Sequence, residues 1–229
     1  MPKTIMETLS KSEIFREITG IGYFGLSKLD KKIAPFLPRR DGFYVELGAN
    51  DGITQSNTYH FEKYKNYSGI LIEPIPEKFT ECKKNRSTRN HFVNCACVSF
   101  DYKKSTMELV YSNLMTTSLE GDSDILDRME HAKSGEHLIK DEIYKFVIQA
   151  KTLTDILIEA SAPKKIDFLS LDVEGSEIEV LQGLDFERFI IGLMCIESRD
   201  FSKLHDFLTS KGYTFFKKIS VHDYLFKII

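Results

Sequence analysis

From residue 43 onward the chain alternates short apolar runs with segments of helical periodicity, and this alternation restricts the fold more than any other feature. Strands that alternate with helices of about ten residues are typical of βαβ units, in which the strands are parallel. The sequence therefore predicts an α/β fold with a mainly parallel sheet and helices on both of its faces. The apolar runs are FYVEL (43–47), GILIEP (69–74), HFVNCACVSF (91–100), IDFLSLDV (166–173), IIGLMCIES (190–198), YTFFKKIS (213–220) and DYLFKII (223–229).

Helix candidates lie between most of these runs, but the last two runs are separated only by Val221 and His222. A connection of that length cannot cross over a sheet, so we expect an antiparallel hairpin at the C-terminus. The predicted helices are SNTYHFEKYKN (56–66), PEKFTECKKN (76–85), LTDILIEAS (153–161), SEIEVLQGL (176–184) and FSKLHDFLTSKG (201–212).

The chain has 229 residues, which is compatible with one α/β domain and an N-terminal extension. Residues 1–38 carry apolar positions at helical spacing and end in APFLP, which predicts a helical appendage before a domain at 39–229. Residues 101–151 form a long insertion whose first part, STMELVYS, alternates as expected of an edge strand. The part after it, residues 118–144, is charged and has weak periodicity, and we expect a solvated helical insertion there, with a lid over the site as the alternative.

Composition excludes several classes of protein. The net charge is −3 and no dense basic block is present, so nucleic acid is not the expected partner. Neither a membrane-spanning run nor the apolar core of a signal peptide is found, and the four cysteines form no C-x-x-C pair. We therefore expect a cytoplasmic protein with reduced thiols, in which Cys95 and Cys97 are small buried hydrophobes.

Small and acidic residues follow the first two apolar runs, at the strand ends where open α/β sheets bind ligands. Gly48 and Gly52 permit a tight turn, and Asn50 tolerates left-handed backbone geometry. A G-x-G-x-x-G phosphate fingerprint is absent, and Glu46 suits a cationic sulfonium better than a diphosphate. Glu73 follows Gly52 by 21 residues, the interval at which a carboxylate accepts both hydroxyls of a ribose. Together these features predict an adenosyl ligand without phosphate.

A second acidic strand end, LDVEGSEIEVLQGL, contains Asp172 and Glu174. Two carboxylates at this spacing can divide the work of a site, one as a base and one holding the substrate. The alternative is that both only stabilise their loop. Ser176 and Glu179 have the spacing of a capping box, so Glu177 and Glu179 are expected to complement the dipole at the start of a helix.

Four stretches of the chain resemble the FkbM family of S-adenosylmethionine-dependent methyltransferases: YVELGANDGITQSNTYHFEK, GILIEPIPEKF, NCACVSFD and TLTDILIE with KIDFLSLDVEGSEIEVLQGLDF. The resemblance runs from about residue 42 to residue 197. It implies a Rossmann-like class I methyltransferase with a seven-stranded sheet whose last strand is antiparallel. Family members mostly methylate hydroxyl oxygens, often on sugars of glycans or of natural products.

The resemblance also implies roles for individual residues. The loop after the first strand is expected around the methionine part of S-adenosylmethionine, Glu73 at the ribose and residues 94–96 at the adenine. Many relatives have lysine where this chain has Ser170. If that lysine holds the acceptor or tunes Asp172, this chain achieves the same in another way. The expected cofactor-binding residues are Glu46, Gly48, Ala49, Asn50, Asp51, Gly52, Ser56, Asn57, Thr58, Glu73, Pro74, Asn94, Cys95, Ala96 and Asp172. Ser56 is also expected to cap the first crossover helix.

Transfer of a methyl group to a sugar hydroxyl requires a base, because the hydroxyl is a poor nucleophile. Asp172 is the expected base, with His60, Glu174 or Glu197 as substitutes. His60 is alternatively a packed histidine. A divalent metal is left open, since Asp172, Glu174, Glu197 and Asp200 have oxygen ligands that could converge.

Two other functions remain open. The first is a binding module that keeps the fold without catalysis, and the second is a methyltransferase acting on a protein or on another small-molecule hydroxyl. The resemblance favours a sugar or a glycan as the acceptor, and the sequence does not identify it further. The sequence also leaves the oligomeric state open, and a homodimer is one alternative.

Overall fold

Strand β1 (Phe43–Leu47) lies inside a seven-stranded sheet, in a computed structural model that describes residues 21–111, 116–118 and 144–228. Its neighbours on the two sides, β2 (Ser68–Ile72) and β8 (Lys165–Leu171), both run parallel to it. The chain therefore leaves β1 toward one edge of the sheet and later returns to the other side of β1. The remaining strands are β3 (His91–Val93), β9 (Ile190–Glu197), β10 (Tyr213–Lys218) and β11 (Asp223–Ile228), and the order is β10-β11-β9-β8-β1-β2-β3.

The C-terminal hairpin is confirmed. Strand β11 runs antiparallel both to β10 at the edge of the sheet and to β9 on its inner side. The register pairs Tyr224 with Ile196 and Phe226 with Met194, which buries the apolar side chains of β11 in the sheet. All other pairings in this sheet are parallel, so the expected architecture of a Rossmann-like sheet with an antiparallel end is observed.

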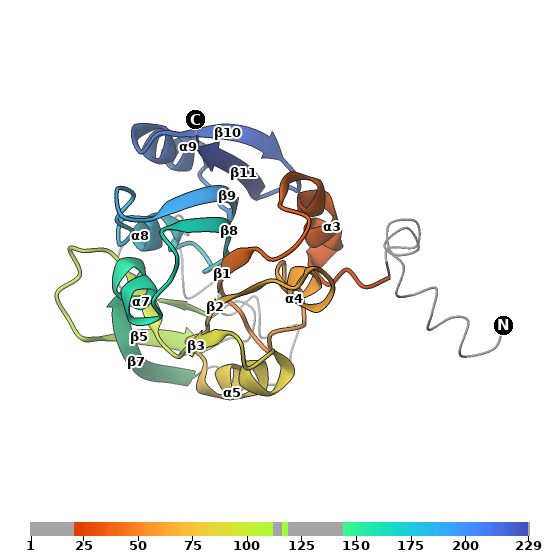
Figure 1. Ribbon diagram of the computed structural model, residues 1–229. Helices are drawn as coiled ribbons and strands as arrows, with labels where there is room; N and C mark the ends of the chain where they lie inside the picture. The colour runs from red at the N-terminus through yellow and green to blue at the C-terminus, as the bar shows by residue number, and fades with distance from the viewer. Residues whose placement is uncertain (1–20, 112–115, 119–143, 229) are drawn as a thin grey trace.

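Helices cover both faces of this sheet, since its strands are apolar on both sides. One face packs against α7 (Leu153–Glu159), α8 (Glu177–Leu181) and α9 (Phe201–Ser210). The other packs against α3 (Leu29–Ile33), α4 (Tyr59–Lys65) and α5 (Pro76–Asn85). In Figure 1 the strands are stacked from β10 at the top to β3 below, with α3 and α4 to the right and α7 and α8 to the left.

The described part of the N-terminal extension packs into the domain core. Short 3-10 turns, η1 (Leu26–Lys28) and η2 (Ala34–Phe36), flank α3. Leu29, Ile33 and Leu37 are buried against the face of the sheet that carries Tyr44 and Phe168. Residues 21–38 thus cover the sheet as its own helices do, whereas residues 1–20 lie outside the described residues.

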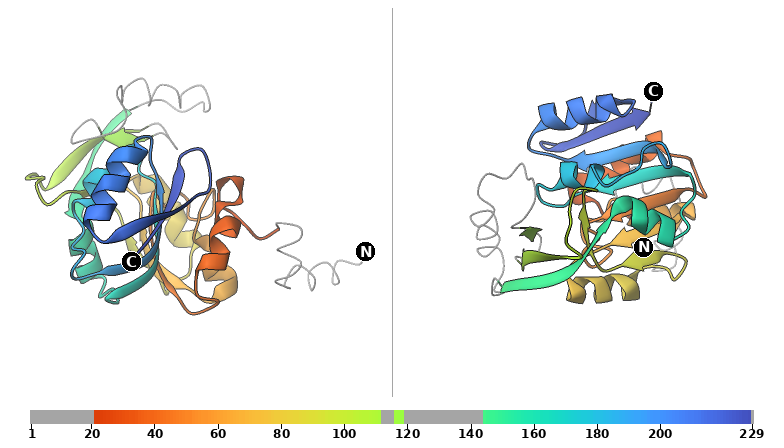
Figure 2. Two further views of the ribbon diagram at one scale, coloured as in Figure 1. Left: turned by 90° about the horizontal axis from the view of Figure 1, so that it is seen from above. Right: turned by 90° about the vertical axis from the view of Figure 1, so that its left-hand side faces the viewer.

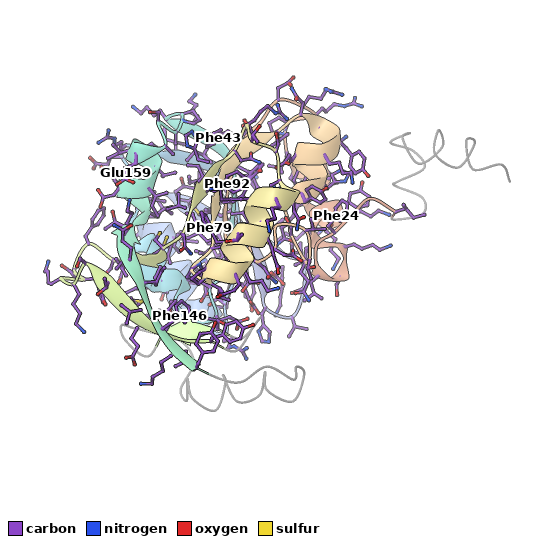
Figure 3. All side chains as sticks on the ribbon, turned by 90° about the horizontal axis from the view of Figure 1, so that it is seen from below. Phe24, Phe43, Phe79, Phe92, Phe146 and Glu159 are labelled. Carbon is purple, nitrogen blue, oxygen red and sulfur yellow. The ribbon has the colours of Figure 1, made fainter. Side chains whose placement is uncertain are left out.

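The third apolar run does not form one strand. It breaks after β3, and β4 (Ala96–Val98) starts a separate four-stranded sheet with order β4-β7-β5-β6. Strands β5 (Thr106–Tyr111), β6 (Thr117–Ser118) and β7 (Tyr144–Thr152) all come from residues 101–152. This second sheet lies beside α7 and α8 (Figures 1 and 2), and in Figure 3 Phe146 of β7 marks it, apart from Phe79 of α5.

One expectation for the insertion is therefore wrong. Strand β5 is not an edge strand, because β6 and β7 pair with it on its two sides. Residues 144–152 form β7, along which Phe146, Ile148 and Ala150 alternate and pack against Met107 and Leu109. Residues 119–143, on which the expected solvated helix falls, lie outside the described residues, so that expectation stays a prediction.

A buried arginine joins β1 to α4 and to the end of α5. Arg86 is 4% exposed, and its guanidinium contacts Glu62 at 2.8 Å and Glu46 at 3.2 Å. It also donates to the hydroxyls of Tyr44 at 2.7 Å and Thr58 at 2.9 Å. Such a network stabilises the fold only when every charge in it is paired, because each buried ion loses its hydration.

Within the part of the chain that is described, no helix has the length and hydropathy needed to cross a lipid bilayer.

Replacement of Arg86 by methionine should lower the free energy of unfolding by about 3–5 kcal/mol, because it leaves Glu46 and Glu62 buried without a cation. Urea denaturation followed by circular dichroism measures this change. Arg89, three residues further on, is exposed, so Arg89→Met is the matched control, with an expected change of about 0.5 kcal/mol or less. A cost below about 1 kcal/mol for Arg86→Met would contradict the role given to the network.

Candidate active site

A cavity opens at the carboxyl ends of β1, β2 and β8, where the order of the strands along the chain reverses. This is the position at which open α/β sheets bind their ligands. The second sheet contributes part of the wall through β4 and β5. The predicted site residues that line the cavity are Gly48, Asn50, Glu73, Pro74, Cys95, Ala96, Asp172 and Glu174.

Gly48 brings the loop after β1 into direct contact with the loop after β8. Its φ is +77°, and a Cβ atom there would lie 2.1 Å from the backbone oxygen of Asp172. Any side chain would therefore both strain the backbone and push Asp172 away. The glycine predicted for a tight turn thus also sets the distance between the two loops that carry the candidate site.

Glu73 is fixed at the end of β2 by two backbone donors. The N–H of Asn50 donates to one carboxylate oxygen at 2.7 Å, and the N–H of Ile75 donates to the other at 2.8 Å. The side chain is only 4% exposed, and this burial raises the pKa of Glu73 from 4.5 to about 7, against the lowering effect of the two N–H groups. A carboxylate is therefore held rigidly on the cavity wall.

Asn50 presents a buried oxygen that no described residue satisfies. Its backbone is left-handed, with φ of +47°, as its residue type allowed us to expect. The Oδ1 atom is buried and has no hydrogen-bond partner among the described residues. Since buried polar atoms in proteins are nearly always paired, a ligand N–H or O–H group is the natural partner for this atom in the cavity.

The structure corrects the expectation that Glu46 faces the ligand. Its carboxylate accepts hydrogen bonds from the Ser56 hydroxyl at 3.0 Å, the Asn57 N–H at 2.9 Å and the Thr58 hydroxyl at 2.6 Å, and it also contacts Arg86. Glu46 is 3% exposed and its neutralising charge is the arginine rather than a bound cation. The loop after β1 is therefore held on the side away from the cavity. The residues that hold it, none of which lines the cavity, are Glu46, Ser56, Asn57 and Thr58.

The N-cap residue of α4 is Thr58 and not Ser56 as expected. Ser56 lies two residues earlier, and its hydroxyl oxygen accepts the N–H of Tyr59, the first residue of α4, at 3.0 Å. Asn57 donates through Nδ2 to the hydroxyl of Ser170 at 3.1 Å, and both side chains are buried. Ser170, the position at which this chain departs from the resemblance described above, therefore belongs to the scaffold between β8 and α4.

Four further predicted residues support the cavity without lining it. Ala49 is packed in the core, and Asp51 accepts the N–H groups of Ile53 and Thr54, which shapes the loop. Gly52 lies against Arg86, which donates to its carbonyl oxygen at 2.9 Å. Asn94 donates to the carbonyl oxygens of residues 73 and 74, at 2.8 and 3.0 Å, so its amide braces the end of β2.

His60 is a packed histidine and not a residue of the cavity wall. It is 1% exposed, its ring stacks on Tyr23 at a centroid distance of 4.2 Å, and its Nδ1 lies 2.8 Å from the carbonyl oxygen of Gly22. The imidazole anchors the N-terminal segment on α4. The structure therefore shows the alternative expected from the sequence, in which His60 is a packed histidine.

Among the described residues, Asp172, Glu174 and Glu197 place carboxylate oxygens within 4.8 Å of one another. Asp172 is exposed to the cavity, and desolvation and the neighbouring Glu197 carboxylate raise its pKa well above the ordinary value. Asp200 is not part of this group, because it accepts the N–H of Lys203 at 3.0 Å at the start of α9. The group has the oxygen donors of a divalent cation site, and equally those of a proton-accepting site.

Glu177, rather than a capping box, shapes the loop after β8. Its Oε1 accepts the N–H groups of Val173 and Gly175, each at 3.1 Å, which holds Glu174 between them with φ of +52°. Ser176 makes no side-chain cap, and Glu179 accepts instead from the hydroxyl of Ser99 at 2.9 Å. The predicted capping box of Ser176 and Glu179 is therefore wrong, because Glu179 bonds instead to a residue 80 positions away in the chain.

Sequence reasoning missed several residues of the cavity wall: Thr54, Gln55, Met107, Leu109 and Glu179. The two from β5 lie in the insertion, whose alternating pattern was visible, but whose position beside the cavity depends on pairing with a strand almost forty residues away. Glu179 was set aside as a helix-start charge. No local signal distinguishes these residues from surface or core positions.

The sheet order, the antiparallel end and a cavity at the strand ends define a Rossmann-like class I methyltransferase. The model of the methyltransferase FkbM domain matches residues 46–215, which is most of the chain, so this protein belongs to the FkbM methyltransferase family.

Individual relatives are more distant. Methyltransferase 1 of Beauveria bassiana is 27% identical over 190 residues, which cover 79% of this chain and 75% of that protein. Methyltransferase sdnD of Sordaria araneosa is 26% identical over 166 residues, covering 64% of this chain and 62% of that one. The crystal structure of methyltransferase FkbM from Methylobacillus flagellatus KT superposes with a TM-score of 0.50 at 12% identity, covering 98% of this chain and 58% of that chain, and so supports the fold.

Glu73 should make the stability of the ligand-free protein pH-dependent. Because its pKa rises from 4.5 to about 7 on folding, its contribution is complete below about pH 4.5 and is lost as the pH rises through about 7. The free energy of unfolding should fall by about 3 kcal/mol across this window through Glu73 alone. Urea denaturation of the wild type and Glu73→Gln at several pH values isolates the effect, and parallel curves for the two proteins would exclude it.

Proposed function

We propose that this protein is an S-adenosylmethionine-dependent O-methyltransferase that acts on a hydroxyl group of a sugar or glycan. The observation that carries the proposal is the pairing, in one cavity, of a rigid acid at the end of β2 with exposed Asp172 at the end of β8. Family membership makes the reaction a methyl transfer. The choice of cofactor, acceptor and base rests on the chemistry of the cavity wall.

The residues of the wall suit an adenosyl cofactor. The carboxylate of Glu73 can accept both hydroxyls of a ribose, and the buried Oδ1 of Asn50 needs a donor that a ligand would supply. Gly48, with φ of +77°, lets the backbone approach a ligand closely. The bound sulfonium would supply an electrophilic methyl group, and the acidic groups around it would favour its positive charge.

Asp172 is the proposed general base. Its carboxylate is exposed to the cavity, and the contact between its backbone oxygen and Gly48 fixes it relative to the loop after β1. In the transfer, Asp172 would accept the proton that the acceptor hydroxyl loses when its oxygen takes the methyl group that the cofactor would supply. Glu174 lines the same cavity and is positioned to hold the acceptor.

Polar side chains at the cavity wall support this acceptor class. Thr54 and Gln55 are exposed there, and their hydroxyl and amide groups suit a neutral acceptor rich in hydroxyls. Such groups can also bind two other kinds of acceptor: a hydroxyl of a small molecule that is not a carbohydrate, or a hydroxyl of a protein.

The conservative variant Asp172→Asn should bind S-adenosylmethionine with a Kd within about threefold of the wild type and should lower kcat by at least about 100-fold. Calorimetry measures the first quantity. Transfer of a labelled methyl group to a panel of nucleotide sugars and glycans, read by mass spectrometry, measures the second. Asp101→Asn, at an exposed position, is the control and should match the wild type.

Each result of this experiment has a definite consequence. Full turnover in Asp172→Asn removes Asp172 from the mechanism, and a wild type that binds the cofactor but methylates no carbohydrate contradicts the acceptor class. Absence of cofactor binding favours the non-catalytic binding module. Loss of activity on addition of a chelator, restored by Mg²⁺, would assign the group of Asp172, Glu174 and Glu197 to a cation.

A further inference from the structure

Glu179 is a buried carboxylate on the wall of the cavity, and the transfer reaction does not use it. It lies on α8 and is 8% exposed. A buried carboxylate is costly unless hydrogen-bond donors compensate for the lost water. Two donors belong to Ser99, the hydroxyl at 2.9 Å and the backbone N–H at 3.5 Å, and both reach the same oxygen, Oε1.

These contacts fix the position of the carboxylate relative to β4. Ser99 follows directly on β4, whose residues Ala96 and Cys97 line the cavity. The bond from the Ser99 hydroxyl therefore ties α8 to the second sheet across the end of this strand. A side chain fixed in this way is preorganised to meet a ligand in one geometry.

The second sheet and α8 contribute mainly apolar residues to the cavity wall. Ala96 and Cys97 come from β4, Met107 and Leu109 come from β5, and Val180 follows Glu179 on α8, while Thr116 and Ser176 are polar. Glu73, the proposed ribose acceptor, follows β2 of the main sheet. The cavity thus has two different regions. In one, the carboxylate of Glu73 can accept hydroxyl groups. In the other, the carboxylate of Glu179 lies beside an apolar surface of the second sheet.

This combination suits a flat aromatic base with an amino group at its edge. An apolar wall accommodates the ring, and an ionised carboxylate only accepts hydrogen bonds, so it favours an N–H group over a carbonyl oxygen. A carbonyl oxygen in place of the amino group would face the carboxylate oxygen, and no hydrogen atom would be available for a hydrogen bond between them.

We propose that Glu179 accepts a hydrogen bond from the exocyclic amino group of adenine and selects adenine against purines that carry oxygen at that position. The proposal rests on the proposed use of an adenosyl cofactor. It adds a residue that determines which base the cavity accepts, and it gives the second sheet a role in forming the base-binding wall.

Calorimetric titration with S-adenosylhomocysteine and with its deaminated analogue S-inosylhomocysteine tests the proposal. The wild type should bind the adenine compound at least about tenfold more tightly, as expected for a hydrogen bond to a charged group. In Glu179→Gln the amide can donate to the inosine carbonyl, so this preference should shrink by at least about fivefold. Glutamine keeps an acceptor for Ser99, and thermal unfolding checks that the variant is folded.

Glu174→Gln is the matched control, since it removes one charge from the same cavity wall at the loop after β8. Its preference for the adenine compound should equal that of the wild type. A preference that is unchanged in Glu179→Gln, or reduced equally in both variants, overturns the role of Glu179 while leaving the cofactor proposal intact. If the wild type binds neither compound, the proposed function itself fails, and this inference fails with it.

Discussion

The ion-pair network around Arg86 is the constraint on which the rest of the structure depends. One buried guanidinium neutralises an acid of β1 and an acid of α4, and it also reaches the hydroxyl of Thr58 and the carbonyl oxygen of Gly52. The loop between β1 and α4 is therefore fixed, on its side away from the cavity, by pairing of buried charges. The opposite side of this loop lines the cavity.

This arrangement divides the acidic residues of the strand ends into two groups. Glu46, Glu62 and Glu177 are used within the protein, to hold a loop or to pair with a cation. Glu73, Asp172 and Glu179 lie on the cavity wall. Glu46, the one charged residue of β1, is buried and is already paired with Arg86 within the protein.

Much of the fold follows from local sequence, because periodicity marks elements that pack on one continuous sheet. Strand β1 and helix α5 begin and end at the residues expected for them. The break between β3 and β4 and the strand at 144–152 were not predictable, since each depends on pairing with a distant segment. At the site, the predicted residues Gly48, Asn50 and Glu73 line the cavity, and their roles toward a cofactor stay predictions. Glu46 was misplaced because its partner, Arg86, lies forty residues away and carries no motif.

The central claim is that Glu73, and not Glu46, meets the sugar of an adenosyl ligand beside Asp172. A crystal structure of the complex with S-adenosylhomocysteine tests it most directly. The account predicts both ribose hydroxyls within hydrogen-bond distance of the Glu73 carboxylate, the sulfur in the part of the cavity between Gly48 and Asp172, and the Glu46–Arg86 pair unchanged. A ribose bound to Glu46, or a ligand outside this cavity, would contradict the account.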